Sequence, residues 1–447
     1  MNPFLPCIAI GLLVLASGCV QGPKINPVDA DAERRLQVGK PFVYQTEAEP
    51  IDIGAAHSSL DIAQCLRLAL EHDPRIQSAL ARVRQAEADA RQTRLLPNPV
   101  IGLSLRFPEH GGKSIIDADL SAELLSLLTR PGRVSAADSR LRKVSSEALA
   151  TVLDVATEVQ RQYADVLALR GRIEVEEARR SNLQQIARIT DARVKAGEAA
   201  RLDGLVSQST LAELETDLIA LRSKQRIARL KLARLIGQPS RAIDWTLTPW
   251  GAPALPEKAE SDWITIALQH RPELLAVQWE LAALGQEVKL AKIEPWTGEL
   301  GAAAERDGDW SVGPSASVSI PIFDTGDIAR AKRQAMVIEQ KHELTRLSRQ
   351  IVEEVRTALE QTRAAAELLD RTQGLLIPLE EQKLKQAQDS YRVGLSDAMT
   401  LRLAEQDAQD ARSKLIELQT QQLQARFDLD RAVGGPGAYT TIATENK

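Results

Sequence analysis

Several features are scarce or missing in this sequence of 447 residues. Aromatic residues make up 3% of it, the 5 histidines are scattered without a His-Glu-x-x-His spacing, and the 3 cysteines form no Cys-x-x-Cys pair. No recognisable catalytic or metal-binding motif results, so we expect no enzyme and no cofactor. With 56 basic against 61 acidic residues, the chain also lacks the basic footprint of a nucleic-acid-binding protein.

The first 18 residues carry no charge and contain an apolar run that is too short to span a bilayer. The run leads into Ala16-Ser17-Gly18-Cys19, which resembles a bacterial lipoprotein signal whose cysteine becomes the lipidated first residue. Val20 after the cysteine resembles lipoproteins of the outer membrane. We expect a signal peptide over 1–18 and a lipid such as palmitate on Cys19; a simple cleaved signal is the alternative. Only Cys65 would then remain, so no intramolecular disulfide is expected.

Long helices dominate the composition, which is rich in Gln, Ala, Leu, Arg and Glu. The stretch 134–196 has no proline, and its apolar residues recur in steps of three and four. At ~1.5 Å per residue such a helix would be roughly 90 Å long, which indicates a coiled coil, a repeat or the wall of something large. No later segment is apolar enough for a membrane helix, so any membrane crossing must use strands.

An internal repeat organises the chain. Ala69-Leu70-Glu71-His72-Asp73-Pro74 matches residues 267–272, and Gly197 matches Gly394 at almost the same offset. Each copy reads as a short helix (60–96 and 262–293), a strand pair, a long helix, a glycine turn and a return helix. Gly374 and Pro378 predict a kink in the second long helix. The expected parts are an extended arm over 19–59, a first repeat over 60–238 (strands 98–107 and 114–125, helices 134–196 and 200–236), a linker over 239–261, a second repeat over 262–434 (strands 298–306 and 310–323, helices 328–393 and 397–433) and a flexible tail over 435–447.

The four strand segments alternate apolar and polar residues and are about ten residues long, as membrane-spanning strands are. A pair of soluble hairpins packed on helices is the alternative. Because open strand edges do not occur in lipid and the smallest membrane barrels have about eight strands, four strands must close with copies from other chains. One face is acidic, through Asp117, Asp119, Glu123, Glu299 and Glu305.

Taken together, the doubled Ala-Leu-x-x-x-x-Pro openings, Leu95-Leu96-Pro97-Asn98-Pro99, Ile320-Pro321-Ile322-Phe323-Asp324 and Arg392-Val393-Gly394-Leu395-Ser396-Asp397 resemble the TolC-like outer-membrane efflux proteins. The resemblance implies a mainly α-helical fold with a membrane β-barrel. Four strands per chain would form a 12-stranded barrel in a homotrimer, above a long α-helical barrel. It also implies a Gram-negative outer membrane, a periplasmic adaptor and an inner-membrane pump of the RND type.

The resemblance assigns roles to the two glycine turns. Adaptor docking is expected at Arg193, Val194 and Gly197 in the first copy, and at Arg392, Val393, Gly394, Leu395 and Ser396 in the second. The family often places an aspartate six residues after each tip glycine, near a periplasmic constriction. Asp203 matches that position, whereas the second copy has Thr400 there and Asp397 nearby.

Further matches, among them Arg130-Pro131-Gly132-Arg133, look closest to the heavy-metal branch typified by CzcC and CusC. Heavy-metal cations are therefore the first expectation for the cargo, because the acidic strand faces suit a cation route. Drugs or other small organic compounds are the alternative. A periplasmic adaptor and a coiled-coil scaffold are the rival classes. An adaptor has one hairpin and more strands, and a scaffold does not explain strand pairs that recur in both copies.

Overall fold

The computed structural model describes residues 35–36, 44, 59–107, 114–123, 125–238, 245–249, 251, 256–307 and 309–440. The expected signal peptide, Cys19 and most of the expected arm lie outside these residues. The described chain falls into two compact units. The strand unit comprises Ala79–Ala148 and Pro272–Ser348, and the hairpin unit comprises Asp29–Ser78, Leu149–Arg271 and Arg349–Lys447.

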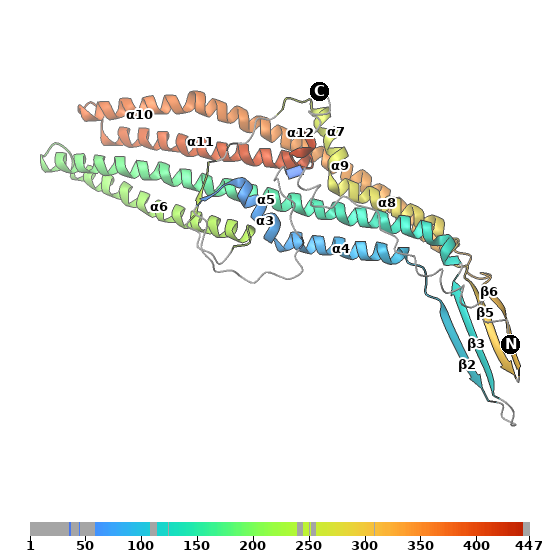
Figure 1. The fold of residues 1–447 in the computed structure, drawn as a ribbon. Helices are drawn as coiled ribbons and strands as arrows, with labels where there is room; N and C mark the ends of the chain where they lie inside the picture. Colours follow the sequence, from blue (N-terminus) through green and yellow to red (C-terminus); the bar gives the residue numbers. More distant parts are fainter. Residues whose placement is uncertain are drawn as a thin grey trace. The chain divides into compact units, whose positions relative to one another are not determined.

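The predicted duplication is confirmed by the element order. The first copy runs α3 (Ile62–His72), α4 (Pro74–Arg94), β2 (Val100–Arg106), β3 (Ile115–Glu123), α5 (Leu125–Lys195) and α6 (Arg201–Leu235). The second runs α7 (Glu260–His270), α8 (Pro272–Leu290), β5 (Gly298–Asp307), β6 (Asp309–Val318), α9 (Asp327–Arg371), the π-helix η2 (Thr372–Leu376), α10 (Ile377–Arg392) and α11 (Ala398–Ala432). Figure 1 shows α5 beside α6 and α10 beside α11 within the hairpin unit.

The short helix that opens each copy was predicted as one element, and this prediction is wrong. The chain leaves the helix at Asp73 (φ −70°, ψ 119°), and α4 begins at Pro74. In the second copy Arg271 (φ −64°, ψ 118°) separates α7 from α8, which begins at Pro272. The proline ring disfavours a helical conformation for the residue before it, while proline itself suits the first helical position.

The long helices also differ from their expected bounds. α5 begins at Leu125 rather than at residue 134 and continues through Pro131. A proline removes one hydrogen bond and disturbs one turn, which does least harm near a helix start. The predicted break at Gly374 and Pro378 takes the form of the π-helix η2, after which the chain continues as α10. A π-turn inserts one extra residue and so rotates the side chains that follow it.

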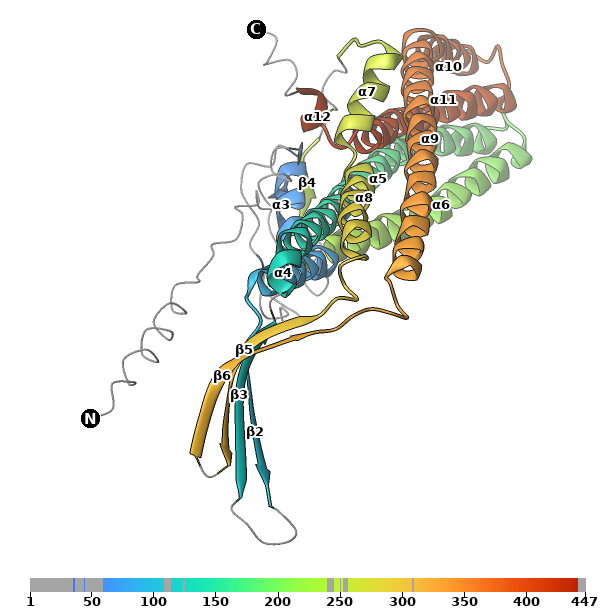
Figure 2. The ribbon, with the colours of Figure 1, turned by 90° about the vertical axis from the view of Figure 1, so that its right-hand side faces the viewer.

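The four long strands form one antiparallel sheet in the order β2-β3-β5-β6, which is visible in Figure 2. The register aligns Leu103 with Ala118, Ala118 with Ala304, and Ala304 with Val312, so these side chains share one face. Strand β6 ends at Val318 rather than at residue 323. Pro321 has no N–H to donate to a neighbouring strand, which limits further pairing.

The segment expected to be a plain linker contributes to the core of the hairpin unit. Strand β4 (Thr246–Leu247) pairs in parallel with β1 (Ser59–Leu60), and Trp245 and Leu247 are buried. The hydroxyl of Tyr163 in α5 donates to the Thr248 carbonyl at 2.7 Å. Helix α7 begins at Glu260, inside the predicted linker range.

Residues after Gly434 were expected to form a flexible tail. Instead, α12 spans Gly437–Thr440, and Ala438 is 4% exposed. Arg35, in the range expected to be an extended arm, has helical backbone and donates from its guanidinium to the carbonyls of His270 and Gly434. These contacts order the end of α11, and residues 441–447 lie outside the described chain.

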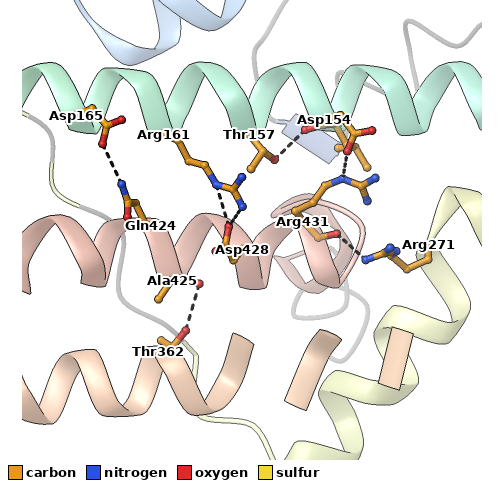
Figure 3. A network of polar contacts seen from close by, with 11 residues as sticks. Asp154, Thr157, Arg161, Asp165, Arg271, Thr362, Gln424, Ala425, Asp428 and Arg431 are labelled. Atoms are coloured by element: carbon orange, nitrogen blue, oxygen red, sulfur yellow. Dashed lines mark hydrogen bonds and ion pairs between the residues drawn. The ribbon is translucent and has the colours of Figure 1, made fainter. Parts of the chain in front are cut away.

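A row of polar contacts joins α5 to α11 within the hairpin unit (Figure 3). Arg431 donates to Asp154 at 2.7 Å, Arg161 pairs with Asp428, and Gln424 donates to Asp165 at 2.9 Å. Thr362 of α9 donates to the Ala425 carbonyl at 3.3 Å, so α11 also contacts α9. The two hairpins of the duplication are thereby joined along their length.

Candidate functional site

The first hairpin tip turns at Gly197, whose φ of 75° is in the left-handed region. The Gly197 N–H donates to the Val194 carbonyl at 3.1 Å, and the Glu198 N–H donates to the Arg193 carbonyl at 2.8 Å. This is the glycine-terminated helix end in which two backbone N–H groups satisfy carbonyls that the helix leaves free. A side chain at Gly197 would meet no atom within 4 Å, so conformation and not space requires the glycine.

The second tip repeats this geometry. Gly394 has a φ of 77°, its N–H donates to the Tyr391 carbonyl at 3.2 Å, and the Leu395 N–H donates to the Ser390 carbonyl at 2.8 Å. Val393 and Leu395 are 68% and 83% exposed. Two apolar side chains therefore lie in solvent at the end of this hairpin, while Ser396 is partly buried.

Arg193 does not point freely into solvent. Its guanidinium carbon lies 5.2 Å from the centroid of the Tyr391 ring, and the Tyr391 hydroxyl lies 3.3 Å from the hydroxyl of the buried Thr190. Arg392, by contrast, is paired with Asp389 at 3.7 Å and its side chain is 78% exposed. The sequence assigned both arginines to the tips but gave no signal for the contact with Tyr391, because that contact joins different helices.

Asp203 and Asp397 both cap the helices that follow the tips. The Asp203 carboxylate accepts from the Ala200 N–H at 3.2 Å, and the Asp397 carboxylate accepts from the Thr400 N–H at 2.8 Å. The contacts with Thr400 lower the pKa of Asp397. Thr400 thus occupies the third helical position, as Asp203 does in the first copy, and each tip holds one carboxylate in its cap.

A buried polar cluster near the tips had no signal in the sequence. Glu405 of α11 is 9% exposed, and burial raises its pKa to about 7, partly offset by Arg179 of α5. Gln409 of α11 donates to Glu176 at 2.7 Å, and Glu176 lies 3.6 Å from Arg179. A carboxyl in such surroundings holds a proton more readily than one in water.

The sheet separates side chains by chemistry. The register places Asp117, Asp119, Glu123, Glu299 and Glu305 on one face, with Ser121, Ser315 and Ser317. Asp117 pairs with Arg106. The opposite face carries Ile101, Leu103 and Val312, which are 78%, 76% and 76% exposed. A large exposed apolar face of this kind indicates contact with lipid or with another protein.

Two searches of the described residues bear on this site. No group of three or more His, Cys, Asp or Glu residues there is arranged to hold a metal ion. In the same ranges, no helix combines the length and the apolar character that a bilayer crossing needs.

The outer membrane efflux protein family model matches residues 65–238 and 263–435. The chain belongs to this family. It is 27% identical, over 96% of both chains, to the pyoverdine export outer membrane protein OpmQ of Pseudomonas aeruginosa. Among solved structures, the outer membrane protein VceC of Vibrio cholerae superposes with a TM-score of 0.71 at 18% identity, covering 84% of this chain and 96% of VceC. CusC, whose title describes transmembrane channel formation, gives a TM-score of 0.67 at 16% identity, covering 89% of this chain and 99% of CusC.

The family and these folds confirm the mainly α-helical, duplicated fold with four membrane-type strands per chain. The efflux protein is thus an outer membrane protein by family. The heavy-metal cargo expected from the sequence is not confirmed, since the relative named above is described as exporting pyoverdine.

Proposed function

We propose that this efflux protein is the exit duct of a tripartite system, which passively conducts a substrate from a periplasmic adaptor and an RND-type inner-membrane pump to the outside. The observation that carries the proposal is the sheet, whose one face is apolar and exposed while the other is acidic and hydroxyl-rich. An apolar outer face and a polar inner face are what a water-filled membrane barrel requires. A protein of either rival class, adaptor or scaffold, would have no use for such a sheet.

Closure of the barrel requires further copies. Edges of a sheet are not tolerated in lipid, and β2 and β6 are the edges of this one. A homotrimer would supply 12 strands, and the same symmetry would arrange the helical hairpins around a periplasmic tunnel. The acidic residues Asp117, Asp119, Glu123, Glu299 and Glu305 would then face the channel.

The hairpin tips are the proposed docking surface for the adaptor. The set comprises Arg193, Val194, Gly197, Arg392, Val393, Gly394, Leu395 and Ser396. Exposed Val393 and Leu395 offer apolar contact, and the glycines let a second backbone approach closely. Asp203 and Asp397 are proposed to line the periplasmic constriction, in addition to capping α6 and α11.

Two cargo classes follow from different observations. The acidic sheet face supports heavy-metal cations, although carboxylates also hydrate any aqueous pore and Asp117 is paired with Arg106. The pyoverdine export relative supports small organic compounds, and its similarity extends over nearly the whole chain. We place organic compounds first on this ground. A deletion strain tested for sensitivity to metal salts and to organic toxicants separates the two classes.

Localisation and docking have separate tests. The mature protein is expected in the outer-membrane fraction as a crosslinkable trimer, and a soluble monomeric periplasmic pool would contradict the barrel. Leu395→Glu and Gly394→Glu are expected to preserve the trimer and abolish efflux. Arg349→Glu, which adds the same charge on exposed α9, is the control. Normal efflux in both tip variants would remove the docking assignment. For the lipid, Cys19→Ala should lose acyl labelling.

A further inference from the structure

Helix α6 has two apolar faces, and the chain covers only one of them. Leu214, Leu218 and Leu221 are buried against Ile173 and Leu183 of α5. On the opposite side every third or fourth residue from 202 to 230 is uncharged and exposed. The large members are 50–67% exposed and are Leu202, Leu205, Ile219, Ile227 and Leu230. Small or hydroxyl side chains fill the positions between them, in the spacing of a coiled-coil seam.

A second apolar edge lies on α9, η2 and α10. Buried Ile351, Val355 and Ala365 mark the inner face of α9, and Ala387 and Tyr391 mark that of α10. Leu368, Leu375 and Leu379 lie on the outer side and are 53%, 50% and 53% exposed. The extra residue of the π-turn keeps both faces in phase, because without it the outer leucines after residue 372 would rotate toward α11.

These two edges lie at opposite ends of one row of helices in the hairpin unit. Helix α6 packs on α5, α5 contacts α11 through the polar row of Figure 3, and α11 packs on α10. The row therefore ends in α6 on one side and in α9–α10 on the other, and both end helices expose apolar residues.

Contacts within the row fix which residues lie at equal height. Lys383 of α10 pairs with Asp407 of α11, and Arg402 of α11 lies 3.9 Å from Glu213 of α6. Stepping along the helices from these contacts places Leu375 at about the height of Ile227. Rotation about a ring axis does not shift a copy along that axis, so residues of equal height in one chain stay level between copies.

Charge along the two edges is complementary at these heights. From Arg222 to Arg234, α6 has six basic residues and no acidic one, whereas nearer its tip it carries Glu213, Glu215 and Asp217. The other edge reverses this order, with Glu367 and Asp370 on α9 and Lys385 on α10. By height, exposed Lys231 is level with Asp370, and exposed Lys385 is level with Glu215.

We infer that the exposed face of α6 packs lengthwise on the α9–η2–α10 edge of a second copy of this chain. The contact joins two different surfaces, so it repeats head to tail and closes into a ring. Ile227 meets Leu375 of the second copy, and Lys231 meets its Asp370. This inference rests on the proposed function only in requiring several copies in the membrane, and it gives the π-turn a role in assembly.

Disulfide crosslinking of the full-length protein in its membrane tests the contact. The double variant Ile227→Cys with Leu375→Cys is expected to give dimers and closed rings under mild oxidation, whereas either single variant gives none. The matched control pairs Ile227→Cys with Gln373→Cys, which lies on the same turn but off the outer leucine face. Equal yields for both pairs would overturn the inference.

Charge exchange supplies an independent readout. Lys231→Glu and Asp370→Lys should each lower the fraction of SDS-resistant oligomer several-fold, and the double variant should restore it. An intact outer-membrane oligomer with no Ile227–Leu375 crosslink and no effect of either charge change would overturn this inference and leave the proposed function standing. A soluble monomer of the unmodified chain would overturn both.

Discussion

The guanidinium of Arg193 in α5 lies over the ring of Tyr391 in α10, with 5.2 Å between the guanidinium carbon and the ring centroid. Each hairpin supplies one partner, so this contact links the last turns of the two copies. A cation–π contact of a partly buried arginine contributes about 1 kcal/mol. The two tips are thus coupled by a local interaction as well as by the chain that joins them.

Removal of the Tyr391 ring should uncouple the tips. Tyr391→Ala loses the cation–π contact and the burial of a large side chain, which together amount to about 2 kcal/mol or more. We expect faster amide hydrogen exchange at residues 186–200 and 385–400. Tyr391→Phe keeps the ring and loses only the contact with Thr190, so it should exchange at close to the unmodified rate. Equal exchange in the alanine and unmodified proteins would show that the contact does not couple the tips.

Glu405 should make stability depend on pH. Its pKa is raised to about 7 in the folded protein from a model value of 4.5, so the folded state binds the proton more tightly. Its contribution to stability is therefore fully present below about pH 4.5 and is lost as the pH rises through about 7. Thermal unfolding of the unmodified protein minus that of Glu405→Gln, measured from pH 4.5 to 8, should show this fall. A difference that does not change with pH would contradict the assignment.

The pair Arg161 and Asp428 should show a small, measurable coupling between α5 and α11. Their side chains are 50% and 33% exposed, and ion pairs of this kind contribute about 0.2–1 kcal/mol. A double-mutant cycle with Arg161→Ala and Asp428→Ala is expected to give a coupling in that range, which should weaken in 1 M salt. A larger, salt-independent coupling would mean that side-chain packing carries the contact.

The two sheet faces should respond differently to a new carboxylate. Val312→Asp places it on the apolar face, where a charge near the bilayer midplane costs about 2–4 kcal/mol for a basic residue and less for an acidic one. Ser315→Asp places it on the polar face of the same strand. We expect the first variant to be depleted from the outer-membrane fraction and the second to insert normally. Equal insertion of both would contradict a lipid-facing apolar side.

The repeat and its periodicities were enough to predict the fold class and the order of elements. Apolar spacing identified the long helices, and strict alternation identified the strands and the acidic face that the register confirms. Both tip glycines were located because only a left-handed turn explains a glycine after so long a helix.

Other features depend on which elements meet, and periodicity does not report that. The apolar spacing of α5 and α11 shows that each has a covered face but not that Arg161 meets Asp428, more than 250 residues away in the chain. The breaks at Asp73 and Arg271 depend on the backbone before a proline, and the strand pair β1–β4 is too short for an alternating pattern. The buried Glu405 has no local signal, because its surroundings come from two helices.

The contact of Arg35 with the carbonyls of His270 and Gly434 sets a length scale for the whole chain. Sixteen residues separate Cys19 from Arg35 in the sequence. An extended chain reaches at most ~3.6 Å per residue, so this segment can span no more than about 58 Å. If Cys19 is lipidated, the base of α11 is tethered within that distance of the membrane surface. The arm then acts as a ruler that limits how far into the periplasm this end of the hairpin unit can lie.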